Sequence, residues 1–131
     1  MPLHPKQIES VLRLSGQERY EHFLKIVADK EEAWGLYSEG WALAKSDNDN
    51  GLIFPIWPAP DYAILCAVDN WANYEPKSID IDDLLDGLLP SLHERKTELS
   101  VFPTPLGRGV TPKLEAFESD LKLELSKFEF E

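Results

Sequence analysis

The side chains that most often bind metals or act as nucleophiles are few and far apart in this chain. They are three histidines and a single cysteine, namely His4, His22, His93 and Cys66. A zinc site needs three or four such ligands converging on one ion, usually at short spacings. No His-x-x-x-His pair and no second cysteine is present. We therefore predict neither a metal nor a cofactor.

Cys66 is expected to be a buried structural residue. One thiol cannot form an internal disulfide, so nothing indicates an oxidising compartment. Cys66 lies in the apolar run 63–68, between Asp61 and Asp69. Negative neighbours raise a thiol pKa, whereas reactive thiols have a lowered pKa. Slow labelling by a thiol reagent at neutral pH is the expected result.

Residues 46–51, Ser-Asp-Asn-Asp-Asn-Gly, superficially resemble a calcium loop. Such a loop has its glycine at position six and a bidentate glutamate at position twelve. Counting from Asp47 puts Gly51 at position five and Pro58 at position twelve. The register fails, and because Asn-Gly favours a positive φ, we predict a turn.

A second acidic cluster consists of Asp80, Asp82, Asp83 and Asp86. Acids in the first turn of a helix complement its dipole, and this is the favoured interpretation. The alternative is an acidic patch for a basic partner. The stretch 69–86 holds six acids against Lys77, a net charge of −5. Nearly half of the net charge of the chain, −11, therefore lies in this stretch.

The segment Gly107-Arg108-Gly109 contains two glycines around a basic residue. It lacks the longer pattern of a phosphate-binding loop. With a helix starting at Thr111, Arg108 and that N-terminus could hold a small anion. A turn in which the glycines permit positive φ is the favoured interpretation.

Aromatic residues are the most distinctive feature. The four tryptophans, Trp34, Trp41, Trp57 and Trp71, fall within 38 residues, with Tyr37, Tyr62 and Tyr74 among them. Most are expected in the core, because they supply large apolar area. The alternative is an interface, since an exposed tryptophan beside prolines, as in 57–60, suits recognition.

Composition excludes several classes. The chain has 131 residues, 13 Lys+Arg against 24 Asp+Glu, and a net charge of −11. Such an acidic balance argues against nucleic-acid binding, which relies on basic side chains. No apolar run reaches the ~18 residues of a membrane span, and no signal-peptide pattern is present. We expect a cytoplasmic protein that does not enter membranes.

Helical periodicity dominates residues 5–30. Pro5 suits the first turn of a helix, and apolar residues follow it at helical spacing. The stronger signal covers 16–30, where Ser15 and Glu18 match a capping box. Apolar side chains then recur every three or four residues: Tyr20, Phe23, Leu24 and Val27.

Short strands are predicted from residue 33 onward. Residues 33–37 and 41–44 read as a β-hairpin, and 52–57 as a third strand. Pro55 lacks a ladder donor, which places it at an edge or strand end.

The second half alternates helices and strands. We expect a helix from about residue 58 to Trp71, a strand at 78–81, and a helix capped by Asp80 that Pro90 ends or bends. A strand at 99–102 and a final helix capped by Thr111 follow. The last helix carries an apolar stripe: Leu114, Phe117, Leu121, Leu125 and Phe128.

These elements predict an α+β fold over residues 1–131 as a single domain. A helical N-terminal segment, 5–30, precedes a sheet-containing body, 33–131. The sheet is expected to have about four to five strands, predominantly antiparallel, with helices packed on it.

Four spaced motifs resemble a known family. They are Glu39-Gly40-Trp41-Ala42-Leu43, the stretch from Phe54 to Ala63 around Phe-Pro-Ile-Trp-Pro-Ala-Pro, Trp71-Ala72-Asn73-Tyr74-Glu75-Pro76, and Val101-Phe102-Pro103-Thr104-Pro105. In this order, over about residues 18–118, they resemble the small bacterial proteins grouped as domain of unknown function 2750. The resemblance implies a small bacterial protein without an assigned activity. The order from residue 52 onward is also loosely similar to the N-terminal domain of SseB-type proteins.

Two kinds of function compete. The favoured one is a non-enzymatic protein-interaction module, of immunity or inhibitor type in one form, for a partner with a basic surface. The alternative is a small-ligand binder or enzyme with a cleft near Trp57, Asp61, Tyr62, Tyr74 and Glu75. A homodimer is a third possibility. The candidate interaction surface comprises Trp57, Asp61, Tyr62, Trp71, Tyr74, Glu75, Asp80, Asp82, Asp83 and Asp86.

Overall fold

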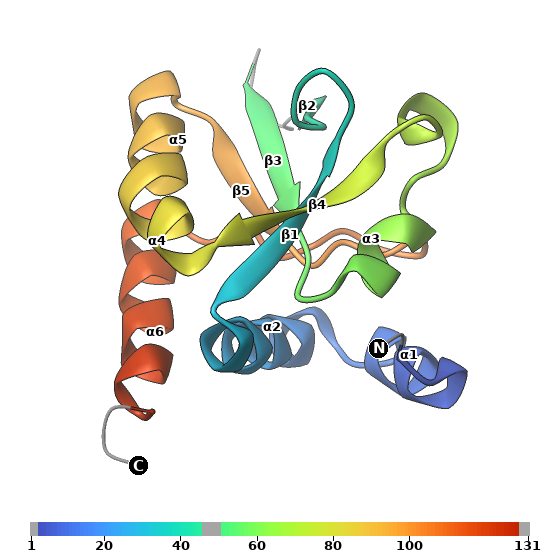
Figure 1. The fold of residues 1–131 in the computed structure, drawn as a ribbon, viewed down its shortest axis with the longest axis horizontal. Helices are drawn as coiled ribbons and strands as arrows, with labels where there is room; N and C mark the ends of the chain where they lie inside the picture. The colour runs from blue at the N-terminus through green and yellow to red at the C-terminus, as the bar shows by residue number, and fades with distance from the viewer. Residues whose placement is uncertain (1–2, 46–50, 129–131) are drawn as a thin grey trace.

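The computed structural model describes residues 3–45 and 51–128 (Figure 1). The predicted turn at 46–51 therefore lies almost wholly outside the described residues. Helices and strands follow one another in the predicted order, α-α-β-β-β-α-β-α-β-α, when the contiguous helical segments are counted together. The α+β class is confirmed.

The N-terminal helices form as the sequence predicts. Helix α1 spans Pro5–Leu12 and α2 spans Gly16–Lys30. The capping box of α2 is present: the Glu18 N–H donates to Ser15 Oγ at 3.1 Å, and the Ser15 N–H donates to Glu18 Oε1 at 3.0 Å. These bonds satisfy two donors that a helix start otherwise leaves unpaired.

The strands form two small sheets where one was predicted. Strand β1 (Glu32–Tyr37) pairs antiparallel with β4 (Glu75–Asp80) along its whole length. The second sheet has the order β2-β3-β5, from Ala44–Lys45, Leu52–Ile56 and Glu98–Val101. Its β3–β5 pair is parallel. A single bridge between Trp34 and Trp57 joins the two sheets.

The predicted hairpin of 33–37 with 41–44 is wrong. Tyr37 and Trp41 share only an isolated bridge, and the partner of β1 is β4. The Trp41 ring folds back over Gly35, where a Cβ atom would come within 2.9 Å of it. The Trp41 ring therefore packs directly on Gly35, and residues 41–44 do not form a second strand paired along β1.

Pro55 lies in the middle strand of its sheet, not in an edge strand. The pairing of β2 with β3 covers only Leu52 and Ile53, so Pro55 lies beyond it. On the β5 side of β3, the Phe102 N–H donates to Ile56 O. In a parallel ladder, neighbouring residues direct their backbone groups to opposite sides, so the nitrogen of Pro55 points away from β5. The missing donor of Pro55 therefore breaks no bond.

Two helix boundaries differ from the prediction. Helix α3 ends at Leu65 (Pro60–Leu65), and a separate turn, η1 (Asp69–Trp71), follows with Asp69 at φ 53°. A left-handed residue cannot continue a helix. Helix α6 spans Leu114–Ser126 with Lys113 as its N-cap, so Thr111 does not cap it.

Pro90 does not end its helix. Segments α4 (Ile81–Asp83), η2 (Leu84–Leu88) and α5 (Leu89–Arg95) run on with helical backbone angles at each junction. The η2 turn is a π-helix, which is wider than an α-helix. A wider turn before Pro90 relieves the clash of its ring with the carbonyl four residues earlier.

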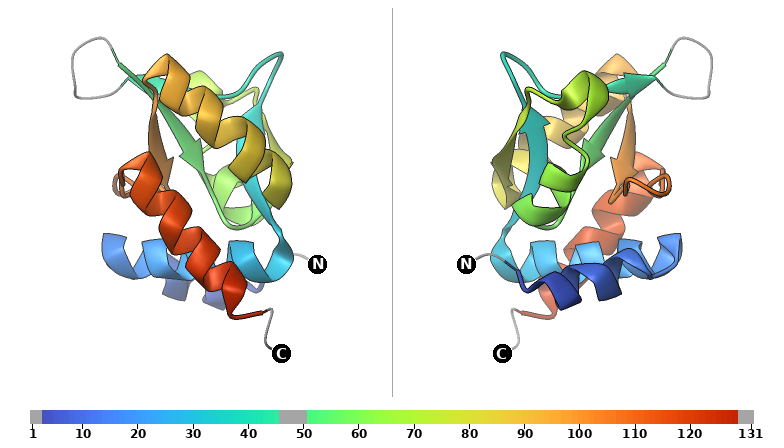
Figure 2. Two further views of the ribbon diagram at one scale, coloured as in Figure 1. Left: turned by 90° about the vertical axis from the view of Figure 1, so that its left-hand side faces the viewer. Right: turned by 90° about the vertical axis from the view of Figure 1, so that its right-hand side faces the viewer.

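The core lies where α2, α6 and the two sheets meet. The largest fully buried side chains include Phe23, Trp57, Phe102 and Phe117. The Tyr20 hydroxyl donates to Asp120 Oδ2 at 2.6 Å, which joins α2 to α6. Figure 2 shows α5 and α6 on one side of the sheets. Among the described residues, no helix is long and apolar enough to cross a membrane.

Candidate functional site

The residues predicted to carry function do not gather at one place. Trp57 is fully buried, and its Nε1–H donates to Pro103 O at 2.8 Å. Tyr62 is also buried. Both contribute to the core instead of a contact surface. Asp61 is half-buried and accepts the Leu3 N–H through Oδ2 at 3.1 Å.

The cleft expected near Trp57, Asp61, Tyr62, Tyr74 and Glu75 is only partly assembled. Asp61 and Tyr62 line a cavity that also borders α2, but Tyr74 and Glu75 are not among its lining residues. Glu75 begins β4 opposite Tyr37 and is exposed. The polar groups needed for acid–base work are thus not brought together there.

The acidic cluster lies at the start of α4 and in η2. Asp80, Asp82, Asp83 and Asp86 are all exposed. Asp80 occupies the N-cap position, but its side chain makes no capping hydrogen bond. This arrangement agrees with solvated acids beside a helix start.

Two adjoining cavities lie against the β2-β3-β5 sheet, and we call them together the Trp71 groove. Their volumes are about 460 and 720 Å³, and they share Ala44, Lys45, Trp71 and Pro103. The walls come from residues 43–45, Ile53 and Pro55 of β3, Cys66, residues 68–71, Glu98 and Ser100 of β5, and the loop 103–111. No residue of an α-helix lines the groove.

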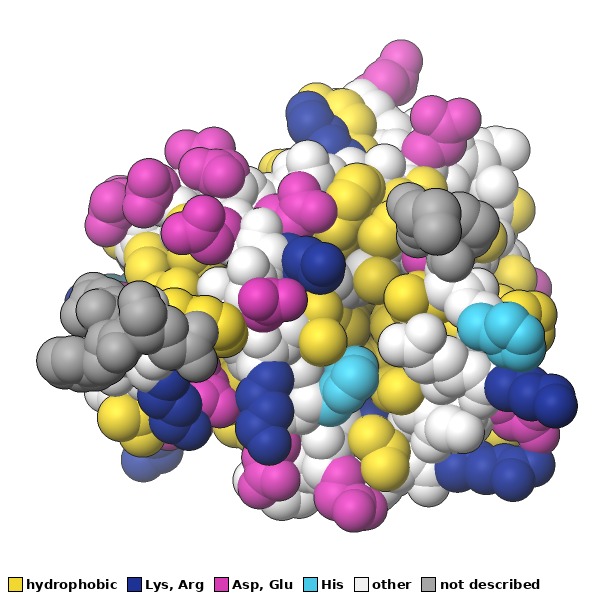
Figure 3. All heavy atoms as spheres, turned by 60° about the horizontal axis from the view of Figure 1, so that its bottom comes forward, with side chains coloured by type: hydrophobic (Ala, Val, Ile, Leu, Met, Phe, Trp, Pro, Cys, Tyr) yellow, Lys and Arg dark blue, Asp and Glu magenta, His cyan; other side chains and the backbone are white. Residues whose placement is uncertain are grey.

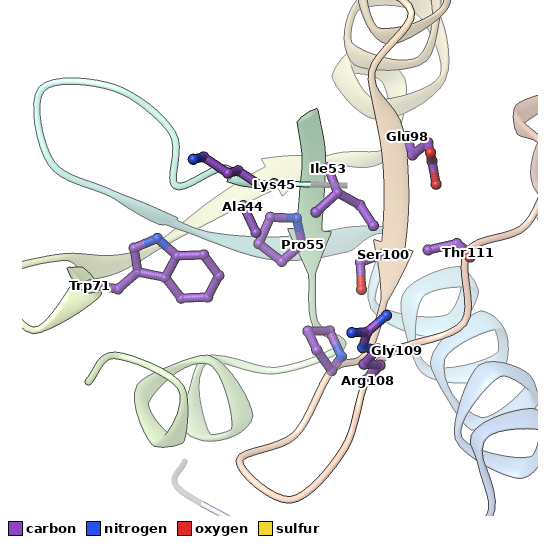
Figure 4. A pocket seen from close by; sticks show the side chains of 11 residues that line it. Ala44, Lys45, Ile53, Pro55, Trp71, Glu98, Ser100, Arg108, Gly109 and Thr111 are labelled. Atoms are coloured by element: carbon purple, nitrogen blue, oxygen red, sulfur yellow. The ribbon is translucent and has the colours of Figure 1, made fainter. Parts of the chain in front are cut away.

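The lining combines a flat apolar surface with hydroxyls and basic groups. Figure 4 shows the Trp71 indole extending toward Pro55, while Ser100 and Arg108 approach from β5 and the following loop. Lys45 lies at the β2 side of the same cavity. An indole with prolines binds apolar groups, and the basic side chains favour a negative one.

Ser100 places a polar group on the wall of the groove. The residue is only 6% exposed, and it lines the cavity between β3, β5 and the loop. A serine hydroxyl can both donate and accept a hydrogen bond, so this wall offers a polar contact to an occupant.

Gly109 keeps the loop close to Ser100. A Cβ atom at this position would lie 2.6 Å from both Ser100 Oγ and Val101 O. Only a residue without a side chain fits between β5 and the loop at this point. The Val101 N–H donates to Val110 O at 2.7 Å, and the reverse bond measures 3.1 Å. The glycine thus sets the wall of the groove.

Phe102 holds the turn out of β5 in a strained conformation. Its φ is 59°, which is rare for a bulky residue. The side chain is fully buried and its N–H donates to Ile56 O at 2.8 Å, so packing on both sides enforces the angle. The strain redirects the chain at once, which places Pro103 over the groove.

Arg19 fixes this loop from α2. The residue is buried, and its guanidinium donates to three backbone carbonyls: Leu14 O at 2.6 Å, Arg108 O at 3.3 Å and Phe102 O at 3.4 Å. A planar guanidinium with five donors can bind three carbonyls in one plane. One side chain therefore ties α2 to both ends of the groove loop.

Cys66 is a structural residue, as its sequence setting predicts. Its Sγ–H donates to Pro103 O at 3.5 Å. Burial raises the pKa of the Cys66 thiol to about 11. A thiol that stays protonated at neutral pH is a poor nucleophile. In the described part of the chain, no group of three or more His, Cys, Asp or Glu residues could hold a metal ion.

The four motifs noted in the sequence meet at the Trp71 groove. Each contributes a lining residue: Leu43, Pro55, Trp71 and Pro103 respectively. The sequence profile of the family described as "Protein of unknown function (DUF2750)" matches residues 20–121. The chain belongs to this family. The extent agrees with the resemblance predicted for about residues 18–118.

Further comparisons add no functional information. No curated protein matches the chain significantly, and no solved structure does. The DUF2750 segment begins within α2 and ends within α6, so it includes both sheets and the groove.

Sequence reasoning singled out Trp71 and Arg108, which line the groove, but not Ser100 or Arg19. Ser100 lies in a short apolar strand and Arg19 in a charged helix, where neither residue type is unusual. The available signals were the polar residue on an otherwise apolar strand and the two glycines around Arg108.

Proposed function

We propose that this chain is a non-enzymatic protein-interaction module that docks a segment of a partner protein in the Trp71 groove. The observation that carries the proposal is a groove floored by Trp71, Pro55 and Pro103, with the polar side chain of Ser100 on its wall. Such a wall needs both a hydrogen-bonding and an apolar occupant.

Exposed apolar side chains around the groove favour a protein partner. Leu43 and Val68, which line the groove, are 41% and 54% exposed, and Leu106, next to the lining residue Pro105 in the sequence, is 96% exposed. Clustered apolar groups at the surface of a protein mark sites of association. A small molecule would leave this rim uncovered.

The dimensions of the groove point the same way. Small-molecule pockets span roughly 300–1,000 Å³ and enclose most of their ligand. Here two connected cavities of about 460 and 720 Å³ lie along the sheet. An extended segment of several residues fits this shape better than a compact ligand.

The charge of the groove defines the chemistry of the occupant. The chain carries −11 overall, yet in the cavity at Ser100 the basic Lys45 and Arg108 outnumber the acidic Glu98, while Asp69 lines the adjoining cavity. A carboxylate near Lys45 can accept a hydrogen bond from the Ser100 hydroxyl. The proposed segment therefore has apolar residues beside one acidic group.

The net charge acts at longer range. A partner that is basic overall would be steered toward a chain of charge −11 before its segment reaches the groove. The acidic residues 80–86 contribute to this field and need no specific contact of their own. An immunity or inhibitor role is the form of this proposal in which the partner is a toxin or an enzyme.

A non-enzymatic role is supported by the surroundings of Ser100. A serine nucleophile needs an adjacent base, most often a histidine. His4 and His22 line the cavity on the α2 side, and His93 is exposed on α5. None of these imidazoles lines the groove.

Selection from a displayed peptide library tests the proposal. The full chain serves as bait, and Trp71→Ala serves as counter-selection bait. We expect enriched peptides with an acidic residue next to aromatic or aliphatic residues. Their binding should weaken at least tenfold in Trp71→Ala and Ser100→Ala, and remain unchanged in Leu123→Ala, an exposed apolar control on α6. Peptides that bind all variants equally would contradict the proposal.

A further inference from the structure

A separate cavity of about 710 Å³ lies between the N-terminal segment, α2, the start of β1 and residues 58–62. We call it the Tyr62 cavity. Its lining includes His22, Glu32, Trp34, Asp61 and Tyr62. Figure 3 shows this side of the molecule, where hydrophobic side chains lie between the two imidazoles in view.

The Tyr62 hydroxyl is the unexplained group of this cavity. The residue is only 2% exposed, and its hydroxyl is buried without a hydrogen-bond partner among the described residues. The ring packs against Phe102 with centroids 4.8 Å apart. Leaving a buried hydroxyl unpaired is costly, which indicates a partner that enters from the cavity.

The charges around the cavity select the sign of that partner. Asp29, Glu32 and Asp61 line it, against Lys30. The ammonium of Lys30 lies 4.0 Å from the Asp29 carboxylate. Within residues 3–45 and 51–128, Glu32 and Asp61 form no ion pair, and Asp61 accepts only the Leu3 N–H through Oδ2. A positive ligand is therefore favoured.

Trp34 adds a surface that binds cations. Glu32 and Trp34 alternate with buried Ala33 on β1 and therefore share a face, about 7 Å apart along the strand. An indole face attracts ammonium groups. The same chain uses this contact elsewhere, since Lys77 Nζ lies 4.0 Å from the centre of the Tyr37 ring.

His22 does not oppose a cation. Burial, aided by the charge of Lys25, lowers the pKa of His22 below its ordinary value, which favours the neutral imidazole. A neutral imidazole can accept a hydrogen bond from an ammonium.

We propose that the Tyr62 cavity is a second binding site, independent of the Trp71 groove, and that it takes an alkylammonium group held by Glu32, Asp61, the Trp34 face and the Tyr62 hydroxyl oxygen. This chemistry occurs in small amines and in the lysine side chain of a peptide. Both sources present the same charged group to the same residues.

NMR titration of the full chain tests the proposal with three probes. Butylammonium represents a free amine, Nα-acetyl-lysine methylamide represents a peptide lysine, and butyrate is the matched anion. We expect saturable shifts of the Trp34 indole signal and of amides 58–62 with at least one cation, and none with butyrate. The more effective cation identifies the source.

Variants decide whether the named residues are responsible. Glu32→Gln and Tyr62→Phe should each weaken cation binding at least fivefold, whereas the neighbouring exposed Glu31→Gln and the groove variant Trp71→Ala should leave it unchanged. If Tyr62→Phe fails to fold, Glu32→Gln decides alone. No saturable shift with either cation, equal binding of butyrate, or an unaffected Glu32→Gln overturns the proposal.

Discussion

At the scale of single residues, the contact between Gly109 and Ser100 controls the shape of the Trp71 groove. A Cβ at Gly109 would meet the Ser100 hydroxyl, a backbone carbonyl and a backbone nitrogen at 2.6–2.9 Å. Backbone atoms cannot move aside as a flexible side chain can. We predict that Gly109→Ala lowers the free energy of unfolding by about 1–3 kcal/mol, measured by urea denaturation.

Gly87→Ala is the matched control for this change. Gly87 lies in the helical segment η2, and no atom comes within 4 Å of the added Cβ. Replacing a glycine where space and backbone permit raises stability by about 0.4–1 kcal/mol, because the unfolded chain loses freedom. Equal effects at both positions would show that the close approach at Gly109 is not what matters.

Residue identity alone could not separate core from surface among the aromatics. Trp57 is followed by Pro-Ala-Pro and for that reason suits a recognition site. In the structure, however, its indole N–H donates to Pro103 O, 46 residues away. Such a partner becomes visible only when distant segments meet. Ser100 was missed for the same reason, because its cavity is formed by β3 and a loop.

At the scale of elements, Arg19 connects α2 with the loop that follows β5. Its guanidinium donates to three backbone carbonyls in the protein interior. We predict that Arg19→Met, which keeps most of the volume, lowers the free energy of unfolding by about 2–4 kcal/mol, since hydrogen bonds to a charged group contribute about 1.5–3 kcal/mol each.

The control for Arg19 is Arg13→Met. The Arg13 side chain is 76% exposed and pairs with Glu9 at the surface, so its loss should change stability by less than about 1 kcal/mol. Amide hydrogen exchange in the Arg19 variant should rise in the loop 102–110 more than in α5. Uniform exchange across the chain would contradict a specific link between α2 and this loop.

Elements with local signals were predictable, and elements with distant partners were not. The α2 capping box and the apolar stripe of α6 follow from spacing within one helix. The pairing of β1 with β4 joins residues that are 38 to 48 positions apart, and no local pattern specifies it. The helix through Pro90 also required a π turn that single-residue preferences do not encode.

At the scale of the whole molecule, buried acidic protons make stability sensitive to alkali. Burial raises the pKa of Cys66 to about 11 and that of Tyr62 to about 12, from ordinary values of 9.0 and 10.0. Desolvation, with Asp120 nearby, also raises the pKa of Tyr20. Above pH 9 the unfolded chain therefore loses protons that the folded chain retains.

We predict that Cys66, Tyr62 and Tyr20 cause no change in the free energy of unfolding below pH 9. Above pH 9 they should make it fall as the pH rises toward 12. Urea titrations at one-unit pH intervals measure this. Cys66→Ala should reduce the part of the loss that begins near pH 9. A stability that stays level from pH 9 to pH 11 would show that these groups are not buried as described.

The net charge of the whole chain and the charges of the groove have different roles in the proposed function. The excess of acids argues against nucleic-acid binding, and in the proposed function it attracts basic proteins at long range. The groove itself presents Lys45 and Arg108. In our account, net charge brings a partner near, and the local residues of the groove select the segment that docks.

Site-specific photo-crosslinking in the source cells tests the central claim most directly. A benzophenone amino acid is placed at Leu106, the exposed residue that follows the groove residue Pro105, or at Leu123, an exposed position on α6. We predict a discrete crosslinked protein from Leu106 that is absent from Leu123 and lost when Trp71→Ala is added. No adduct at Leu106, or the same adducts from both positions, would contradict a docking function for the Trp71 groove.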